Sequence, residues 1–194
     1  MNFKEQVYSV LIVSASQKFN DALPELFPLP VFSPVTIVSN ISAAKRAVSE
    51  RDFDIVLINS PLPDDSGVRF SIDTVNEYNT VVLFLCRTEQ YDELYERLAV
   101  HGIFMMQKPA SKAIFQTAAG WLISARERIR KTEKKTLSIE EKMNEIRLVN
   151  RAKWLLISAV KMTEPDAHRF IEKQAMDRCI GKRQVAEEII KTYG

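Results

Sequence analysis

The sequence predicts a doubly wound α/β domain followed by an all-α region, and two observations lead to this prediction. In the first 110 residues, short apolar runs rich in β-branched residues alternate with stretches long enough for two or three helical turns. From residue 111 to residue 193 the pattern is helical throughout. Alternating strands and helices predict parallel βαβ units, whereas unbroken helical periodicity predicts helices that pack on one another.

Five apolar runs are the predicted strands. Continuous Val, Ile and Leu residues are typical of parallel strands that are buried on both faces. The runs lie at residues 7–13, 35–38, 55–58, 81–85 and 103–106, and the predicted helices between them at 19–27, 41–50, 68–78 and 90–101. Together they indicate a flavodoxin-like (βα)5 domain over residues 1–125. Such sheets bind ligands beyond the carboxyl ends of their strands.

Composition excludes several classes of protein. Of the 194 residues, 46% are hydrophobic and 27% are charged, as in an ordinary globular protein. Cys86 and Cys179 are too few for a disulfide framework, and no His/Cys cluster has metal-ligand spacing, so no metal or cofactor is expected. The sequence lacks both an apolar run of the roughly 20 residues that cross a membrane and a signal peptide. We therefore expect a cytoplasmic protein.

The segments that follow two of the predicted strands resemble those of a response-regulator receiver domain. PLPDDSG follows DFDIVLI, and QKPAS follows the last predicted strand. The resemblance spans roughly residues 7–125 and the repeated βα pattern supports it. In receivers, acidic residues at these strand ends hold Mg²⁺ and one Asp accepts a phosphoryl group.

This sequence departs from the receiver pattern at that phosphorylation site. Ser14 and Ala15 stand where the resemblance implies acids, Asn59 where it implies the phosphoacceptor Asp, and Cys86 where it implies a hydroxyl residue. Only Lys108 remains. A carboxamide cannot form an acyl phosphate, and Mg²⁺ prefers carboxylate and other hard oxygen ligands. We therefore expect a pseudo-receiver whose input is a partner protein, a ligand or oligomerisation.

Two acidic residues lie in the turn beyond Asn59. Asp64 and Asp65 are expected to cap the helix that follows them. Lys108 is expected either to form an ion pair with one of them or to face solvent. Met105, three residues before Lys108, is expected to be a core side chain.

Charge is divided unevenly along the chain. Residues 1–110 hold 9 Lys+Arg and 14 Asp+Glu, a net charge of −5, whereas residues 111–194 hold 18 and 11, a net charge of +7. A basic second part favours a polyanionic partner such as a nucleic acid. The alternative is that long solvated helices simply carry many Lys and Arg residues.

A helix with a coiled-coil seam is predicted to connect the two parts over residues 111–136. Apolar residues recur at two heptad positions without a change of register. We expect a parallel dimer, the alternative being a helix packed on its own domains. A local break is expected near residues 136–138, where Ser138 would cap a new helix. The residues expected in the dimer seam are Leu122, Ile129, Ile139, Met143 and Ile146.

Residues 137–194 predict a three-helix bundle. Thr163 is the expected N-cap of the second helix, and Gly181 is expected to end it. Cys179 is expected to be a small buried side chain.

The order of motifs in this bundle resembles an ANTAR domain, the RNA-binding module of transcription antiterminators. An Ala-Lys pair (Ala152, Lys153) is followed by Leu156, the TEPDA helix start, an Ala-Met pair and a closing helix with Val185-Ala186. One departure is Trp154, where the family usually has a small residue. A receiver joined by a coiled coil to ANTAR is a known arrangement of this family.

The ANTAR resemblance implies that the partner is hairpin RNA in nascent leader transcripts. Cations would meet the phosphates, and aromatic side chains would stack on unpaired bases. Trp154 and Tyr193 are candidates for stacking, with a role as core or cover of the bundle as the alternative. The RNA-binding candidates are Arg147, Arg151, Lys153, Lys161, Arg169, Lys173, Lys182 and Arg183.

Catalytic motifs are missing from the sequence. We find no nucleophile–base pair, no glycine-rich phosphate loop and no paired catalytic carboxylates, so we expect no enzyme activity. The prediction is a homodimeric transcription antitermination regulator, controlled by a partner protein or a ligand. A DNA-binding response regulator and a protein-interaction adaptor are the alternatives.

Overall fold

The computed structural model describes residues 6–27 and 31–194. The chain forms two compact units, residues 1–131 and 132–194. Within the part that is described, no helix combines the length and apolar character that would let it cross a membrane.

The first unit contains one parallel sheet of five strands in the order β2-β1-β3-β4-β5. This is the flavodoxin-like strand order, so the predicted fold class is confirmed. All five residues of β3 are buried, as the apolar runs indicated. The strands are β1 (Tyr8–Val13), β2 (Phe32–Val38), β3 (Ile55–Asn59), β4 (Val81–Arg87) and β5 (Phe104–Lys108).

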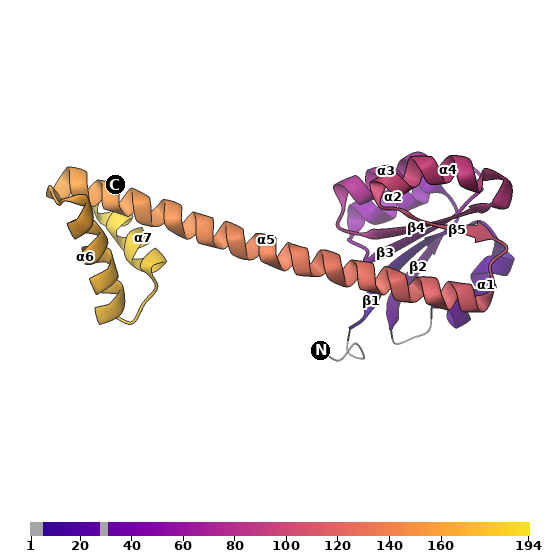
Figure 1. Ribbon diagram of the computed structural model, residues 1–194, viewed down its shortest axis with the longest axis horizontal. Helices are drawn as coiled ribbons and strands as arrows, with labels where there is room; N and C mark the ends of the chain where they lie inside the picture. The colour runs from indigo at the N-terminus through magenta and orange to yellow at the C-terminus, as the bar shows by residue number, and fades with distance from the viewer. Residues whose placement is uncertain (1–5, 28–30) are drawn as a thin grey trace. The chain divides into compact units, whose positions relative to one another are not determined.

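Helices cover both faces of this sheet (Figure 1). The helices α1 and α5 pack on one face, where Leu23 and Phe115 join the core. The other three helices pack on the opposite face, where Ala44, Phe70 and Leu98 join a second core cluster. The bounds are α1 (Gln17–Leu26), α2 (Ile41–Glu50), α3 (Val68–Glu77), α4 (Tyr91–Leu98) and α5 (Lys112–Val160).

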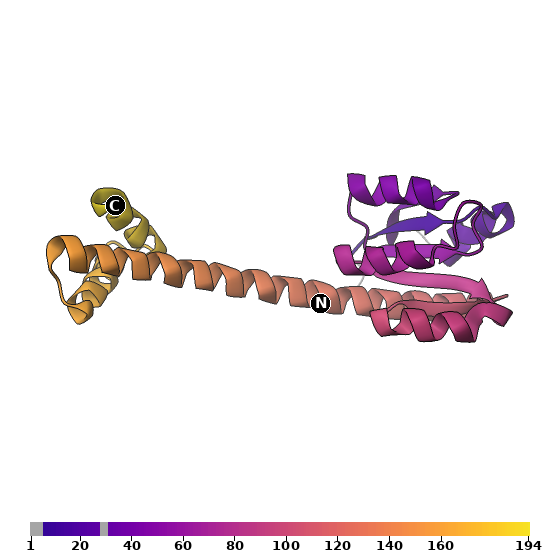
Figure 2. The same cartoon turned by 90° about the horizontal axis from the view of Figure 1, so that it is seen from above.

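The helix α5 runs without interruption for 49 residues and supplies side chains to both units (Figures 1 and 2). The expected break at residues 136–138 is therefore wrong. Residues 121–160 contain neither Pro nor Gly and are rich in Lys, Glu, Arg, Leu and Ala, which are the strongest helix formers. Thr136 and Ser138 lower the helix propensity only slightly, and Ser138 starts no new helix.

The first turns of α5 belong to the core of the first unit. Leu122 is 1% exposed, and Ile129 packs against the same cluster. Both residues were expected in a seam between two chains, and the structure corrects this, because their side chains cover the sheet of their own domain. Heptad spacing produces one apolar face on a helix, and a sheet can bury that face as well as a second helix can.

The second unit is a bundle of three helices, formed by the end of α5 with α6 (Glu164–Asp177) and α7 (Lys182–Tyr193). Thr163 is the N-cap of α6 and accepts a hydrogen bond from the Asp166 amide, as predicted. Small side chains let the helices approach closely. The buried core consists of Ala152, Leu156, Ala167, Ile171, Ala175, Val185, Ala186 and Ile189.

The turn between α6 and α7 differs from the prediction in two ways. Gly181 is the N-cap of α7 rather than the end of α6, and its φ of −71° is ordinary for any residue. Cys179 takes the left-handed conformation after α6, with a φ of 51°, and it is exposed. Because α6 already ends at Asp177, Cys179 lies in the turn and outside the bundle core.

Candidate functional site

Three of the predicted phosphorylation-site positions are joined by hydrogen bonds at the carboxyl edge of the sheet. The Asn59 amide Nδ2 donates to Ser14 Oγ over 3.0 Å, and Lys108 Nζ donates to Asn59 Oδ1 over 2.6 Å. Lys108 also donates to the Ser60 carbonyl. The Lys108 ammonium group is therefore held by neutral acceptors at the strand end. It forms no ion pair with Asp64 or Asp65, and it does not simply point into solvent.

The other two predicted phosphorylation-site positions, Ala15 and Cys86, lack the side-chain groups that phosphorylation requires. Ala15 is exposed and has no oxygen in its side chain. Cys86 is fully buried, and burial raises the pKa of its thiol, so that the side chain is neutral at pH 7. Over residues 6–27 and 31–194, no group of three or more His, Cys, Asp or Glu side chains is placed to hold a metal ion.

Asp64 and Asp65 hold the loop between β3 and α3 in place. Asp64 accepts hydrogen bonds from the backbone N–H groups of Ile41 and Ser42, both over 3.0 Å. It therefore caps the earlier helix α2 rather than the helix that follows, and these bonds keep the pKa of its carboxyl below the ordinary value. Asp65 accepts from the Gly67 amide over 2.7 Å, just before α3.

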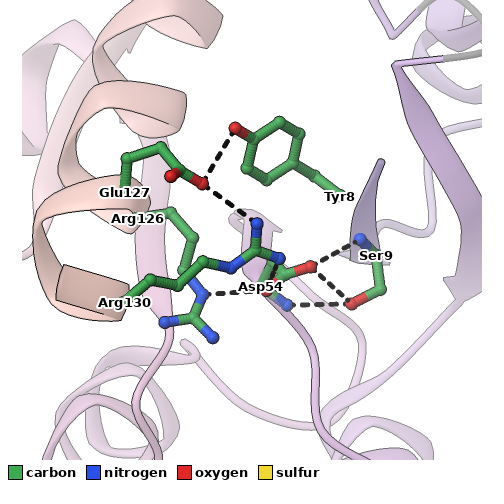
Figure 3. A network of polar contacts seen from close by, with 6 residues as sticks. All are labelled: Tyr8, Ser9, Asp54, Arg126, Glu127 and Arg130. Atoms are coloured by element: carbon green, nitrogen blue, oxygen red, sulfur yellow. Dashed lines mark hydrogen bonds and ion pairs between the residues drawn. The ribbon is translucent and has the colours of Figure 1, made fainter. Parts of the chain in front are cut away.

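A network of polar contacts at the opposite edge of the sheet joins α5 to β1 and β3 (Figure 3). Asp54 Oδ1 accepts from Arg126 Nε and from an Arg130 guanidinium nitrogen, each over 2.8 Å. Glu127 Oε1 accepts from Arg130 and from the Tyr8 hydroxyl, each over 3.0 Å. The Arg130 guanidinium also lies 5.0 Å from the centre of the Tyr8 ring.

The contacts of this network shift the pKa values of Asp54 and Tyr8. Burial raises the pKa of Asp54, but hydrogen bonds from Ser9 and Arg126 and the charge of Arg130 lower it more, so the net pKa lies below the ordinary value. Burial and the hydrogen bond to Glu127 raise the pKa of Tyr8 to about 12. This network was not predicted from the sequence, because a coiled-coil seam over residues 111–136 leaves no expected partner for their basic side chains within the first unit.

In the second unit, the RNA-binding candidates fall into two groups. Three of them form ion pairs within the unit: Lys153 with Glu164 over 3.2 Å, Lys182 with Glu172 over 2.6 Å, and Arg183 with Glu187 over 2.9 Å. The other five are exposed, namely Arg147, Arg151, Lys161, Arg169 and Lys173. The structure thus offers both paired and solvent-facing cations on this unit.

A groove of about 410 Å³ lies among the three helices of the second unit. Three lysines line it, Lys142 and Lys153 from α5 and Lys182 from α7, together with His168 of α6 and one carboxylate, Glu145 of α5. Lys142 and Lys153 are eleven residues apart, about three helical turns, so they share one face of α5. That spacing is a sequence signal through which Lys142, which was missed, could have been found.

Aromatic side chains of this unit face solvent. Trp154 is 68% exposed and Tyr193 is 46% exposed, so neither is a core residue. Both can therefore present a ring face to a flat partner such as a nucleic acid base.

The strand order and the Lys108-Pro109 pair at the carboxyl edge define the first unit as a receiver fold, and solved structures agree. A response regulator receiver domain protein from Clostridium thermocellum superposes with a TM-score of 0.56 at 15% identity, covering 65% of this chain and 99% of that chain. The signal receiver domain of an HD domain-containing protein from Pseudomonas fluorescens Pf-5 gives 0.56 at 17% identity, covering 63% and 99%. These likenesses show that the first unit has the fold of a receiver domain.

The second unit matches a known domain family. Residues 138–190 match the family described as ANTAR domain. "Transcriptional regulatory protein PdtaR" of Mycobacterium tuberculosis is 27% identical over 141 residues, which cover 73% of this chain and 69% of that protein. The chain thus joins a receiver fold to a segment that matches the ANTAR domain family, and it is similar to a transcriptional regulatory protein over 141 residues.

Proposed function

We propose that this regulator binds hairpin RNA in nascent leader transcripts through its ANTAR domain and so prevents transcription termination. The ANTAR match over residues 138–190 is the observation that carries this proposal. The similarity to a protein named as a transcriptional regulator supports a role in transcription.

The surface of the ANTAR domain has the chemistry that this function requires. The groove lined by Lys142, Lys153, His168 and Lys182 suits phosphate groups, and such contacts give affinity that falls with salt. The exposed Trp154 supplies a ring on which an unpaired loop base can stack. Phosphate contacts and base stacking together favour a hairpin with a single-stranded loop over a regular duplex.

The receiver is proposed to be regulated without phosphorylation at its usual position. The carboxamide of Asn59 is held between Ser14 and Lys108, where an acceptor carboxylate would be needed. The proposed role of the receiver is therefore to respond to a ligand, a partner protein or self-association, with no catalytic step.

A homodimer is the proposed active form. Ile139, Met143 and Ile146 are each at least 50% exposed and follow one heptad register along α5. A second copy of this chain offers the same apolar strip, so the two can cover each other. A dimer that engages two hairpins gains affinity through effective concentration.

The test is a salt titration of RNA binding. The probe is a synthetic RNA with two tandem small-loop hairpins, and the variant is the double substitution Lys153→Gln with Lys182→Gln. The slope of log K against log salt is negative, and each lost phosphate contact reduces its magnitude by about 1, so we expect the double variant to reduce it by about 2. Lys191→Gln, at an exposed cation outside the groove, is the matched control and is expected to leave the slope unchanged.

Three results would contradict the proposal. An unchanged affinity of the double variant, with its helical content intact, would place the RNA elsewhere. Preference for duplex DNA of the same sequence would favour a DNA-binding regulator. Binding to neither nucleic acid would favour a protein-interaction adaptor.

A further inference from the structure

A cavity of about 640 Å³ opens beside the carboxyl edge of the receiver sheet. Phe19 and Leu26 of α1, Leu85 of β4 and Phe115 of α5 form its apolar walls. The volume lies within the range of small-molecule sites, which combine an apolar lining with a few convergent polar groups. The proposed RNA interface does not involve this cavity, which belongs entirely to the first unit.

The charged residues that line the cavity are unbalanced. Four cations, Lys18, Arg87, Lys108 and Lys112, face one carboxylate, Glu25. Glu25 is already paired with Lys112 over 2.8 Å. Among residues 6–27 and 31–194, Lys18 and Arg87 have no ion-pair partner within 4 Å. Three positive charges therefore remain without a compensating negative charge.

Lys108 is the most buried of these cations. Two of its three N–H donors are used by Asn59 Oδ1 and the Ser60 carbonyl, which are neutral acceptors. Burial, and to a lesser extent the nearby charge of Arg87, lower the pKa of Lys108. An anion at this position would compensate two like charges at the same time.

We propose that this cavity binds a small organic anion. Its carboxylate or phosphate group lies near Lys108 and Arg87, and its compact aromatic or aliphatic body lies against the apolar wall that Phe19 and Phe115 form together. Arg87 and Lys108 offer charge-assisted hydrogen bonds, which are stronger than neutral ones. The ligand contacts α1 and the first turns of α5, so it is an input that needs neither a phosphoacceptor nor Mg²⁺.

Calorimetric titration of the full chain with three matched probes tests this site. The probes are 1-naphthoate, 1-naphthyl phosphate and the neutral 1-naphthalenemethanol. Both anions are expected to bind saturably with one site per chain, and the neutral probe about tenfold more weakly or worse. The ratio of the two anion affinities shows which of the two anionic groups the site prefers.

Three variants locate the binding site. Ala22→Trp fills the cavity without a change of charge, and Arg87→Glu reverses one lining charge; each should weaken anion binding about tenfold or more. Both positions are exposed, so the fold should persist, which circular dichroism checks. Arg46→Glu, an equal charge reversal at an exposed position of α2, should leave the affinity unchanged.

The proposal fails if neither anion binds saturably at millimolar concentration, or if the neutral probe binds as tightly as the anions. Equal affinity in the wild type and in both cavity variants would also overturn it. None of these outcomes bears on RNA binding by the ANTAR domain, so the two proposals stand or fall separately.

Discussion

Asn59 is the residue that most separates this receiver from one that can be phosphorylated. Both ends of its carboxamide are engaged, with Nδ2 donating to Ser14 and Oδ1 accepting from Lys108. An aspartate could accept from Lys108 but could not donate to Ser14 when ionised. Asn59 thus uses its amide nitrogen for a contact that an ionised aspartate could make only by accepting from the Ser14 hydroxyl.

Phosphoryl donors should leave the protein unmodified. Acetyl phosphate with Mg²⁺ is expected to give no phosphoryl adduct by intact-mass measurement, in the wild type or in Asn59→Asp, because Ser14 and Ala15 supply no carboxylate for the metal. Adding Ala15→Asp to the Asn59 variant supplies one ligand at an exposed position, and only this double variant should gain an adduct. A Mg²⁺-dependent adduct on the wild type would contradict the pseudo-receiver proposal.

At the scale of elements, the network around Asp54 fixes α5 to the receiver. Asp54 and its two arginines have side chains that are 12–20% exposed, so their attraction is little screened by solvent. Removing one partner of a buried pair leaves the other charge uncompensated, which costs more than the pair contributes. The network thus makes the position of α5 on the sheet sensitive to single substitutions.

Substitution of Asp54 by Asn should destabilise the first unit by about 3 kcal/mol at pH 7. Because the pKa of Asp54 is depressed in the folded state, its contribution is present above its ordinary pKa of 3.8 and is lost as pH falls further. The difference between variant and wild type should therefore shrink below about pH 4. The loss of stability is measured by chemical denaturation and by hydrogen exchange of the β1 and β3 amides.

The control for this prediction is Asp73→Asn. Asp73 pairs with Arg69 over 3.5 Å on α3, where both side chains are largely solvated. Exposed pairs contribute about 1 kcal/mol or less, so this variant should stay close to the wild type at every pH. If Asp54→Asn lowers the free energy of unfolding no more than the control does, the network does not hold α5 on the sheet.

Sequence patterns predicted the elements of this protein better than their contacts. The predicted helix at residues 41–50 matches α2 at both ends, because apolar periodicity and the Asn40 N-cap act locally. The burial of Leu122 against the sheet was not predictable, because the same heptad spacing suits a coiled coil.

Long-range polar contacts escaped prediction for a different reason. Asp64 caps a helix that begins 23 residues earlier, and Asp54 meets Arg126 from a distance of 72 residues in the chain. Capping preferences along the chain suggest that a carboxylate in a turn caps the helix that follows it. Only the tertiary fold brings the N-terminus of α2 within reach of Asp64. Likewise, the receiver resemblance singled out Lys108 and Asn59, but the hydrogen bond between them depends on how the strands end.

At the scale of the whole molecule, the proposed homodimer depends on the middle of α5. Replacing Ile139 and Ile146 by Ser should weaken self-association about 100-fold or more, because a dimer would bury four isoleucine side chains. Sedimentation equilibrium over micromolar concentrations measures the molar mass. Leu137→Ser is the matched control, since Leu137 is 59% exposed but lies outside the heptad register.

The sedimentation result can contradict the proposal in two ways. A dimer that persists in the double variant would place the interface on another surface. A wild-type chain that stays monomeric throughout the concentration range would remove the dimer altogether.

The division of α5 into two buried stretches and an exposed one has a consequence for modularity. Side chains up to Arg130 stabilise the receiver, those from Leu148 onward join the ANTAR core, and residues 134–144 between them are all exposed. A receiver fragment cut at residue 125 would lose Arg126 and Arg130 and leave Asp54 unpaired. A gene junction within 134–137, before the ANTAR match begins, keeps both modules whole, so recombination there can exchange output domains at the least cost to folding.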